Sequence, residues 1–297
     1  MNRASAQRLA RLLIFVTPAL WCVNYLVARS AVDVAAPHAL ALGRWVMAGM
    51  LLTAFSWSEI SSKRDAIRAE WPSLVLLGAL GMWICGAFVY IGAHTTAASN
   101  IALIYAVSPV LIALYSTLAL GERMGPAQAA GVGLAFLGVL HVALKGHWPG
   151  LLSLAFTRGD LWIAVAALSW TAYALILKGM PSAFGALARL ALICWGGVIV
   201  LLPFTLIEAL WFMPTVLDAR TLFYVVALAL FPGFGAYLAY SFMQRELGAA
   251  RVGVVTYLGP LYSAALAWAV LGEPVYAFHV VGAALILPGI FLATRAR

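Results

Sequence analysis

Two stretches of this sequence repeat one pattern: "IYAVSPVLIALYSTLALGERMGPAQAAGVGLAFLGVLHV" at residues 104–142 and "VTYLGPLYSAALAWAVLGEPVYAFHVVGAALILPGIFL" at residues 255–292. In each, an apolar run that contains a proline precedes a Gly-Glu pair and a second apolar run. An internal repeat at one fixed offset predicts two copies of one structural unit. The matched residues lie 151 positions apart and are Pro109 and Pro260, Gly121 and Gly272, Glu122 and Glu273, Gly131 and Gly282, and Gly138 and Gly289.

The composition places the chain in a membrane. Of its 297 residues, 65% are hydrophobic and 9% are charged, whereas soluble domains carry roughly 25% charged residues. The net charge of +8 is typical of Lys and Arg in cytoplasmic loops, and no basic stretch is long enough to bind nucleic acid. Three dispersed cysteines within apolar runs (Cys22, Cys85 and Cys194) predict packing roles rather than disulfides or a zinc site.

We expect an all-α polytopic membrane protein with ten transmembrane helices, because a span needs about 20 mostly apolar residues. Continuous apolar runs disfavour a β-barrel. Pro18, Asn24 and the lack of an A-x-A-like cleavage site indicate a retained first span rather than a signal peptide. The longest connections are expected at 58–70, 145–160 and 211–222. The predicted spans are residues 12–28, 39–57, 73–94, 97–120, 127–144, 161–178, 184–209, 222–244, 252–271 and 275–294.

The distribution of Lys and Arg predicts the orientation. Ten spans place both termini on one side of the membrane. If that side is the cytoplasm, thirteen of the 18 Lys and Arg residues lie there, as the positive-inside rule requires. We therefore expect a bacterial inner-membrane protein with cytoplasmic termini, the lipid bilayer as its surroundings and no nucleic acid partner. The cations expected on the opposite side are Arg29, Arg44, Lys145, Arg158 and Arg220.

The repeat predicts two domains, residues 1–147 and 148–297, with five spans each. Because five is odd, the second copy must enter the membrane from the opposite face. Inverted repeats of this kind are typical of secondary transporters with a substrate site between the halves, and they predict alternating access. Further aligned pairs are Trp21 with Trp170, Arg29 with Lys178, and Arg44 with Arg189.

These paired motifs resemble the EamA-type repeats of the drug/metabolite transporter superfamily across the whole chain. The aromatic-rich first half, which includes "YIGAHTTAASNIALIYAVSPV", is similar to the YddG type, inner-membrane exporters of aromatic and other neutral amino acids. The resemblance implies a ten-helix, basket-shaped bundle with a central cavity between two inverted five-helix repeats. Its motifs are a Trp in the first helix, an Arg early in the second, a Pro in the fourth and Gly-Glu at the end of the fourth.

Polar and aromatic residues inside the predicted spans are the candidates for substrate binding. An unpaired polar group costs several kcal/mol in hydrocarbon, so these residues should face the interior. There they would suit a zwitterion with an apolar side chain. The alternative is that Trp and Tyr anchor the protein at the lipid interface. The candidates are Trp21, Asn24, Tyr90, His94, Asn100, Tyr105, Ser108, Trp170, Tyr173, Tyr237, Ser241, Gln244 and Tyr257.

His94, Arg44 and Arg189 could each contact the substrate or have a structural role. His94 could bind a substrate carboxylate or relay a proton, or it could be structural. Arg44 and Arg189 are expected to support the scaffold rather than touch substrate. No carboxylate is expected at the bilayer midplane, where ion-coupled carriers commonly use one. Facilitated export is therefore favoured, with His94 as the remaining route to proton coupling.

Four residues are candidates for a hinge or gate. Pro109 and Pro260 each remove one helical hydrogen bond, and interrupted helices at matched positions indicate the binding site. A fixed packing kink is the alternative. Glu122 and Glu273 are expected to cap loops or form gate contacts at opposite faces.

The leading functional hypothesis is a transporter of neutral amino acids that uses no ATP and no cofactor or metal, with a monomer as one expectation. Alternatives within the superfamily are a drug or small-metabolite exporter and a proton-coupled antiporter. An enzyme is disfavoured because HExxH, GxGxxG and P-loop motifs are absent from the sequence. A channel would need a continuous polar stripe. A phosphate substrate would need several cavity cations, and only Arg44 and Arg189 are expected within reach.

Overall fold

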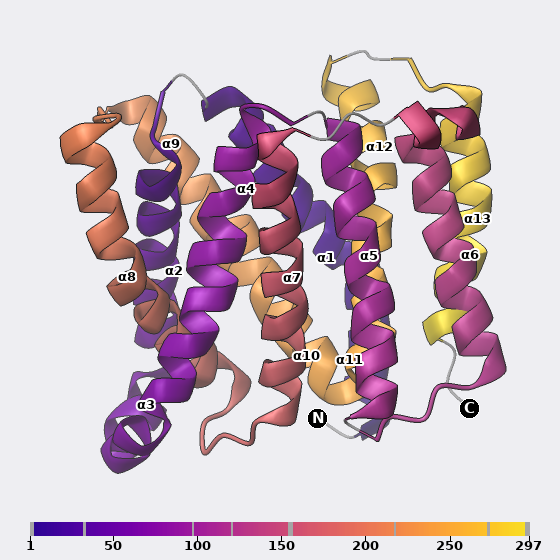
Figure 1. Cartoon of the computed structure of the whole chain (residues 1–297). Coiled ribbons are helices and arrows are strands. Elements are labelled where there is room, and N and C mark those ends of the chain that lie inside the picture. Colours follow the sequence, from indigo (N-terminus) through magenta and orange to yellow (C-terminus); the bar gives the residue numbers. More distant parts are fainter. Residues whose placement is uncertain are drawn as a thin grey trace.

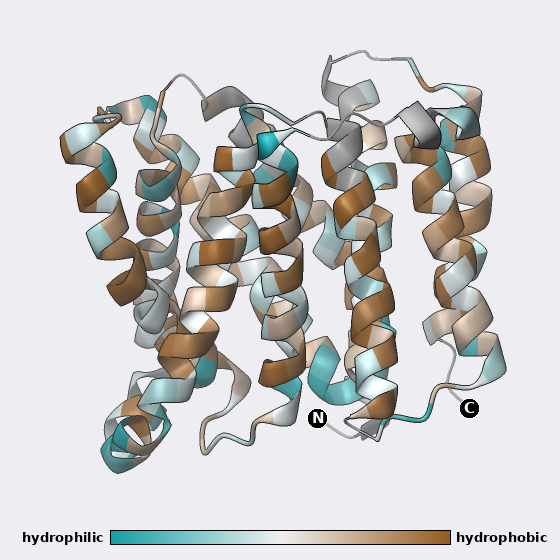
Figure 2. Cartoon of the chain, viewed as in Figure 1, coloured by the Kyte–Doolittle hydropathy of each residue, from teal (hydrophilic) through white to brown (hydrophobic). Residues whose placement is uncertain are grey.

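The computed structural model describes residues 3–31, 34–96, 98–119, 121–153, 157–216, 218–271 and 274–294. Throughout these ranges the regular structure is helical. The helices stand side by side, and both ends of the chain lie at the same face of the bundle (Figure 1). We call this face the terminal face. Apolar residues line the middle of the helices, whereas hydrophilic residues gather toward the helix ends (Figure 2).

Five helical runs form the first half of the chain. The third run is continuous, because α3, a π-helix and α4 follow one another without a break. Proline at the first position starts α2 and α6, where its missing N–H costs nothing. The elements are α1 (Arg3–Ala31), α2 (Pro37–Ser62), α3 (Arg64–Gly78), η1 (Ala79–Ile84), α4 (Cys85–Ala93), α5 (Ala98–Leu118) and α6 (Pro126–Ala143).

The second half repeats this order. Its third run again contains a π-helix, and its fourth run is divided by a 3₁₀ segment. The elements are η2 (Trp148–Ser153), α7 (Arg158–Gly179), α8 (Ala186–Trp211), α9 (Ala219–Leu228), η3 (Ala229–Ala236), α10 (Tyr237–Leu247), α11 (Ala249–Gly253), η4 (Val254–Leu258), α12 (Gly259–Leu271) and α13 (Ala277–Thr294).

Eight helices among the described residues are long and apolar enough to cross a membrane, and Leu103–Leu118 is a shorter apolar helix. The predicted ninth span, residues 252–271, is divided among α11, η4 and α12. Its crossing of the membrane therefore stays a prediction. The break between the second and third runs lies within the connection predicted at 58–70, but it is shorter than predicted, because α2 and α3 have only Lys63 between them. The other charged residues of this stretch lie in α2 or α3 rather than in a loop.

Glycine contacts between α6 and α13 are reciprocal, as expected if an antiparallel twofold axis relates the two halves. A Cβ atom at Gly131 would lie 2.5 Å from the carbonyl oxygen of Gly289, and one at Gly138 would lie 3.0 Å from that of Gly282. Gly282 and Gly289 are the repeat partners of Gly131 and Gly138. Each glycine therefore contacts the partner of the other, which is the reciprocity that a twofold axis imposes.

The ends of α2 and α8 repeat this reciprocity with carboxylates. Glu208, near the end of α8, accepts the backbone N–H of His38 at the start of α2 over 2.9 Å. Glu59, near the end of α2, accepts the N–H of Gly185 before α8, also over 2.9 Å. Each carboxylate thus satisfies an N–H group that the start of the other helix leaves unpaired.

The start positions of α2 and α8 correct the predicted alignment of one residue pair between the two halves. Both α2 and α8 have 26 residues, and Arg44 is the eighth residue of α2 whereas Arg189 is the fourth of α8. Pairing Arg44 with Arg189 is therefore wrong by about one helical turn. The residue of α8 that corresponds to Arg44 is Ile193. Consequently the two arginines occupy different environments, and they need not share a role.

Candidate functional site

Six aromatic side chains meet between the two halves, and we call them the ring cluster. Four helices supply them: α1, α2, α7 and α10. Trp170 stands at the centre, with ring centroids 5.5 Å from Trp21, 5.7 Å from Tyr237 and 4.9 Å from Tyr240. The cluster comprises Trp21, Trp45, Trp170, Tyr173, Tyr237 and Tyr240.

Carbonyl groups of the π-helix η1 orient one side of this cluster. The indole N–H of Trp45 donates to Met82 over 3.0 Å, and the hydroxyl of Tyr237 donates to Gly81 over 2.9 Å. A π-helical turn changes the regular hydrogen-bond ladder, and such turns often mark functional sites. The matched position of the second half holds η3, so both halves have this irregularity beside the cluster.

Three buried polar atoms of the ring cluster have no hydrogen-bond partner: Trp170 Nε1, Tyr173 OH and Tyr240 OH. Buried polar groups are nearly always paired with protein or water, and leaving one unpaired costs about 1–3 kcal/mol. The three atoms belong to neighbouring rings, because the ring of Trp170 lies 5.6 Å from that of Tyr173 and 4.9 Å from that of Tyr240.

A polar hub lies beside the rings and is centred on Asn24. Its amide oxygen accepts the hydroxyl of Tyr90 over 2.6 Å and a guanidinium N–H of Arg44 over 3.1 Å. Arg44 is only 4% exposed, and its guanidinium lies 4.3 Å from the ring centre of Trp45. An aromatic face attracts a cation, so the ring and Asn24 together hold this buried charge.

The remaining predicted residues are spread more widely. Ser108 donates to the carbonyl of Ala167 over 3.1 Å, and Tyr257 donates to that of Ala106 over 2.9 Å. Both hydroxyls are therefore engaged in packing contacts. Tyr105 is half-buried, with its hydroxyl 3.7 Å from Cys85 Sγ. His94 is exposed at the end of α4, away from the ring cluster. The side chain of Asn100 lies outside the described residues.

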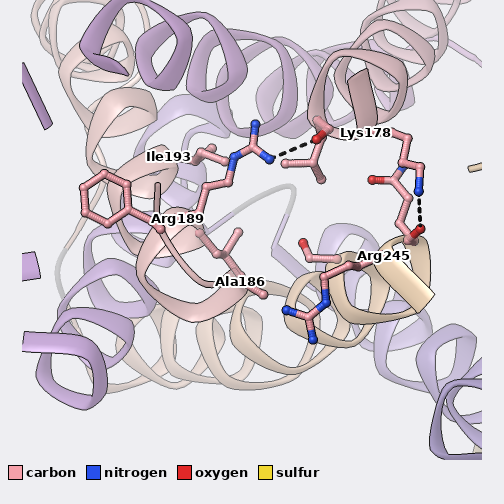
Figure 3. Close-up of a pocket in the computed structure, with 10 residues that line it drawn as sticks. Lys178, Ala186, Arg189, Ile193 and Arg245 are labelled. Atoms are coloured by element: carbon pink, nitrogen blue, oxygen red, sulfur yellow. Dashed lines mark hydrogen bonds between the residues drawn. The ribbon is translucent and has the colours of Figure 1, made fainter. Parts of the chain in front are cut away.

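A cavity of about 180 Å³ opens next to the ring cluster, toward the terminal face. Two of the predicted residues, Ser241 and Gln244, line it. Figure 3 shows that Lys178, Arg189 and Arg245 surround it. The expectation that only Arg44 and Arg189 could reach a cavity is therefore wrong, because the last turn of α7 and the end of α10 bring two further cations there.

Sequence reasoning missed two members of the ring cluster, Trp45 and Tyr240. A signal for Tyr240 was present, because it lies 150 positions after Tyr90, close to the repeat offset. Trp45 carried no such signal. It follows Arg44 directly, and only the rotation of α2 shows that its ring faces Tyr237, with centroids 4.9 Å apart.

The predicted hinge residues differ between the halves. Pro109 is buried inside the continuous helix α5, whereas Pro260 lies in the first turn of α12, directly after the 3₁₀ segment η4. The fourth run is therefore divided only in the second half of the described chain. Proline fits a first helical turn without loss of a hydrogen bond. Glu273 lies outside the described residues.

Glu122 joins the two halves at the terminal face. Its two carboxylate oxygens accept the N–H groups of Ala249 and Ala250 over 2.9 and 3.0 Å. Gly248, just before them, has φ +89°, and a Cβ there would lie 2.9 Å from Glu122 Oε1. Glycine is needed at this position both for the backbone conformation and for the close approach.

We expect Glu122→Ala to lower the midpoint of thermal unfolding by a few degrees in detergent, because the variant loses both acceptors of a helix start, worth about 1–2 kcal/mol. Glu246→Ala is the matched control. Its partner Arg245 has a side chain that is 59% exposed, and exposed ion pairs contribute little. Equal midpoints for the two variants would contradict a capping role for Glu122.

Comparison with known proteins places these features in a family context. The sequence profile of the EamA-like transporter family matches residues 8–144 and again residues 157–295. An "Uncharacterized transporter" of Archaeoglobus fulgidus is 26% identical, with 95% of this chain and 96% of the relative covered. A "Probable terminal-alkyne amino-acid exporter" of Streptantibioticus cattleyicolor is 25% identical, with 95% and 92% covered.

Two further similarities concern substrate type and fold. An "S-adenosylmethionine/S-adenosylhomocysteine transporter" of Chlamydia trachomatis is 24% identical, with 89% of this chain and 83% of that protein covered. A solved crystal structure superposes with a TM-score of 0.77 at 22% identity, covering 99% of this chain and 97% of the other. At this identity the superposition supports the fold alone.

Proposed function

Because this chain belongs to the EamA-like transporter family, we propose that it exports aromatic and other neutral amino acids across a bacterial inner membrane without ATP. The observation that carries this proposal is the ring cluster with its three unpaired polar atoms. Aromatic walls suit an apolar or aromatic side chain, and the unpaired N–H and hydroxyl groups suit the polar end of an amino acid. The resemblance to YddG-type exporters supports the same substrate class.

The twofold relation of the halves supports alternating access, because inverted halves can exchange conformations. The hydrogen bonds from Ala249 and Ala250 to Glu122 hold the halves together at the terminal face. These bonds must break before a path can open between the halves there. We place the terminal face in the cytoplasm, in accordance with the distribution of Lys and Arg. The hinge roles of Pro109 and Pro260, and the gate role of Glu273, belong to this proposal.

The carboxylates of the described chain support facilitated export over ion coupling. Glu122 accepts N–H groups at a helix start, and further carboxylates accept hydrogen bonds at helix starts, loops or caps: Glu59, Glu70, Asp160, Glu208 and Asp218. Carriers coupled to protons or sodium commonly use a carboxylate inside the membrane. Proton coupling through His94 is the alternative, and it predicts a transport rate that depends on the pH gradient.

A second candidate substrate is an adenosyl-containing amino acid. The chlamydial relative is named for such compounds, and an adenine ring could stack on the ring cluster. An adenosyl amino acid shares the carboxylate and amine of the first candidate but needs a larger space. Competition between the two compound classes in one transport assay therefore decides between them.

Counterflow in proteoliposomes tests the proposal. Vesicles loaded with unlabelled phenylalanine should accumulate labelled phenylalanine, with methionine, threonine and S-adenosylmethionine as competitors. We expect rates that are equal with and without a pH step. Accumulation that requires the pH step would show proton coupling. No exchange of any neutral amino acid would contradict the proposed substrate class.

A further inference from the structure

The cavity near the terminal face lies one helical turn from the ring cluster. Leu177, Ser241 and Gln244 line it, and each follows a cluster tyrosine by four residues. Residues four apart on a helix are neighbours on one face. A solute in this cavity would therefore be next to Tyr173, Tyr237 and Tyr240, on the side from which we propose that cytoplasmic solutes enter.

The cavity has a strongly positive lining. Lys178, Arg189 and Arg245 line it, and the lining set contains no Asp or Glu. Lys178 Nζ donates to the carbonyl of Gln244 over 3.3 Å. The terminal guanidinium nitrogens of Arg189 donate to the carbonyls of Leu177 and Met180 over 3.0 and 2.9 Å. Carbonyl groups orient these cations but do not neutralise them.

Nearby carboxylates offset only part of this charge. Glu246 pairs with Arg245 over 3.2 Å at an exposed position. Glu70 accepts the hydroxyl of Ser182 and the N–H of Ala183, each over 2.6 Å, and forms no ion pair with Arg189 among the described residues. Arg189 Nε is buried and has no partner. Lys178 and Arg189 thus leave positive charge facing a space large enough for a small anion.

We propose that this cavity is an entry site that recognises the carboxylate of a soluble substrate before the substrate reaches the ring cluster. Lys178 supplies a point charge, and Ser241 supplies a hydroxyl donor. The amide nitrogen of Gln244 donates to the carbonyl of Ala174 over 2.8 Å and has one further N–H. The apolar part of the solute faces Leu177, Leu190 and Ile193, which also line the cavity. The choice of an aromatic amino acid as the probe rests on the proposed function.

Three probes separate carboxylate recognition from other binding. Phenylalanine carries both charged groups, 3-phenylpropionate lacks the amine, and phenylalaninamide lacks the carboxylate. Binding is measured with the full chain in a neutral detergent by microscale thermophoresis. We expect phenylalanine and 3-phenylpropionate to bind, and phenylalaninamide to bind at least tenfold more weakly. Equal affinity for phenylalanine and its amide would overturn the inference.

Variants of Lys178 identify the site. Lys178→Gln should weaken binding of phenylalanine and 3-phenylpropionate about tenfold without changing the affinity for the amide, and Lys178→Arg should restore part of the loss. Arg68→Gln, which removes an exposed cation of α3 outside the cavity, is the matched control. Unchanged carboxylate binding in Lys178→Gln, or an equal loss in Arg68→Gln, would overturn the inference.

The same measurements distinguish the carboxylate site from the proposed substrate class and from a lipid site. If 3-phenylpropionate binds in a Lys178-dependent way and no amino acid binds, the carboxylate site stands and the proposed substrate class fails. If phenylalanine binds but its binding does not depend on Lys178, the proposed substrate class stands and the carboxylate site fails.

The same titration in nanodiscs with phosphatidylglycerol tests a lipid source of the anion. Loss of 3-phenylpropionate binding there, but not in neutral nanodiscs, would assign the site to a lipid headgroup and overturn our assignment.

Discussion

Replacement of Trp170 by alanine is expected to reduce counterflow of phenylalanine more than tenfold. The ring of Trp170 lies between those of Trp21, Tyr173, Tyr237 and Tyr240, with centroid separations from 4.9 to 5.7 Å. Removal of the indole leaves a cavity among these rings, which costs about 3–5 kcal/mol in a packed core. Both the wall of the proposed site and its unpaired N–H group are lost.

A second variant keeps this prediction testable if Trp170→Ala does not fold. Trp170→Phe retains an aromatic ring but removes the Nε1 donor, so stability should change little while transport falls. Trp57→Phe is the matched control, because Trp57 is 61% exposed on the outer surface of α2. Equal transport by the two phenylalanine variants, measured at equal amounts of folded protein, would contradict a substrate role for Trp170.

Replacement of Gly131 by leucine should prevent the helices α6 and α13 from packing. A Cβ at this position would already lie 2.5 Å from the nitrogen of Ala293 and 2.5 Å from the oxygen of Gly289. Backbone atoms cannot move aside as side chains can, and overpacking costs typically about 1–3 kcal/mol or more. We expect a loss of monodisperse protein on size-exclusion chromatography.

The same helix offers a control for this prediction. Gly133 is two residues further along α6, is exposed, and has no atom within 4 Å of a Cβ built there. Gly133→Leu should therefore behave like the unmodified protein, and Gly131→Ala should be intermediate. If Gly131→Leu is as monodisperse as Gly133→Leu, the close approach of α6 and α13 is not needed for folding.

The helical runs were predictable because local signals define them. The run predicted at 127–144 is α6, Pro126–Ala143, which begins at a proline that fits a first helical turn. The charged stretch at 58–70 misled the prediction, because a helix can continue beyond the apolar layer. The sequence did not predict that α4 ends at Ala93. His94 directly follows the last residue of this helix, and its side chain is exposed.

The candidate site was only partly predictable. Trp21, Trp170, Tyr173 and Tyr237 were named from the sequence and belong to the ring cluster, but Trp45 and Tyr240 were not. Lys178 was noted only as a repeat partner, yet it lines the cavity. Ser108 and Tyr257 had the same sequence signal as the cluster residues, and the structure shows both donating to backbone carbonyls.

The sequence alone determined that this is a helical membrane protein with two related halves, because apolar runs and a repeat at one offset are written along the chain. The tertiary structure decided which residues share a site. Helix rotation and register place a side chain, and a shift of four residues moves it by one turn, as Arg44 and Arg189 show. A repeat can be recognised in the sequence even when two residues are misaligned by one turn. The ring contacts around Trp170, by contrast, depend on the exact position of each residue.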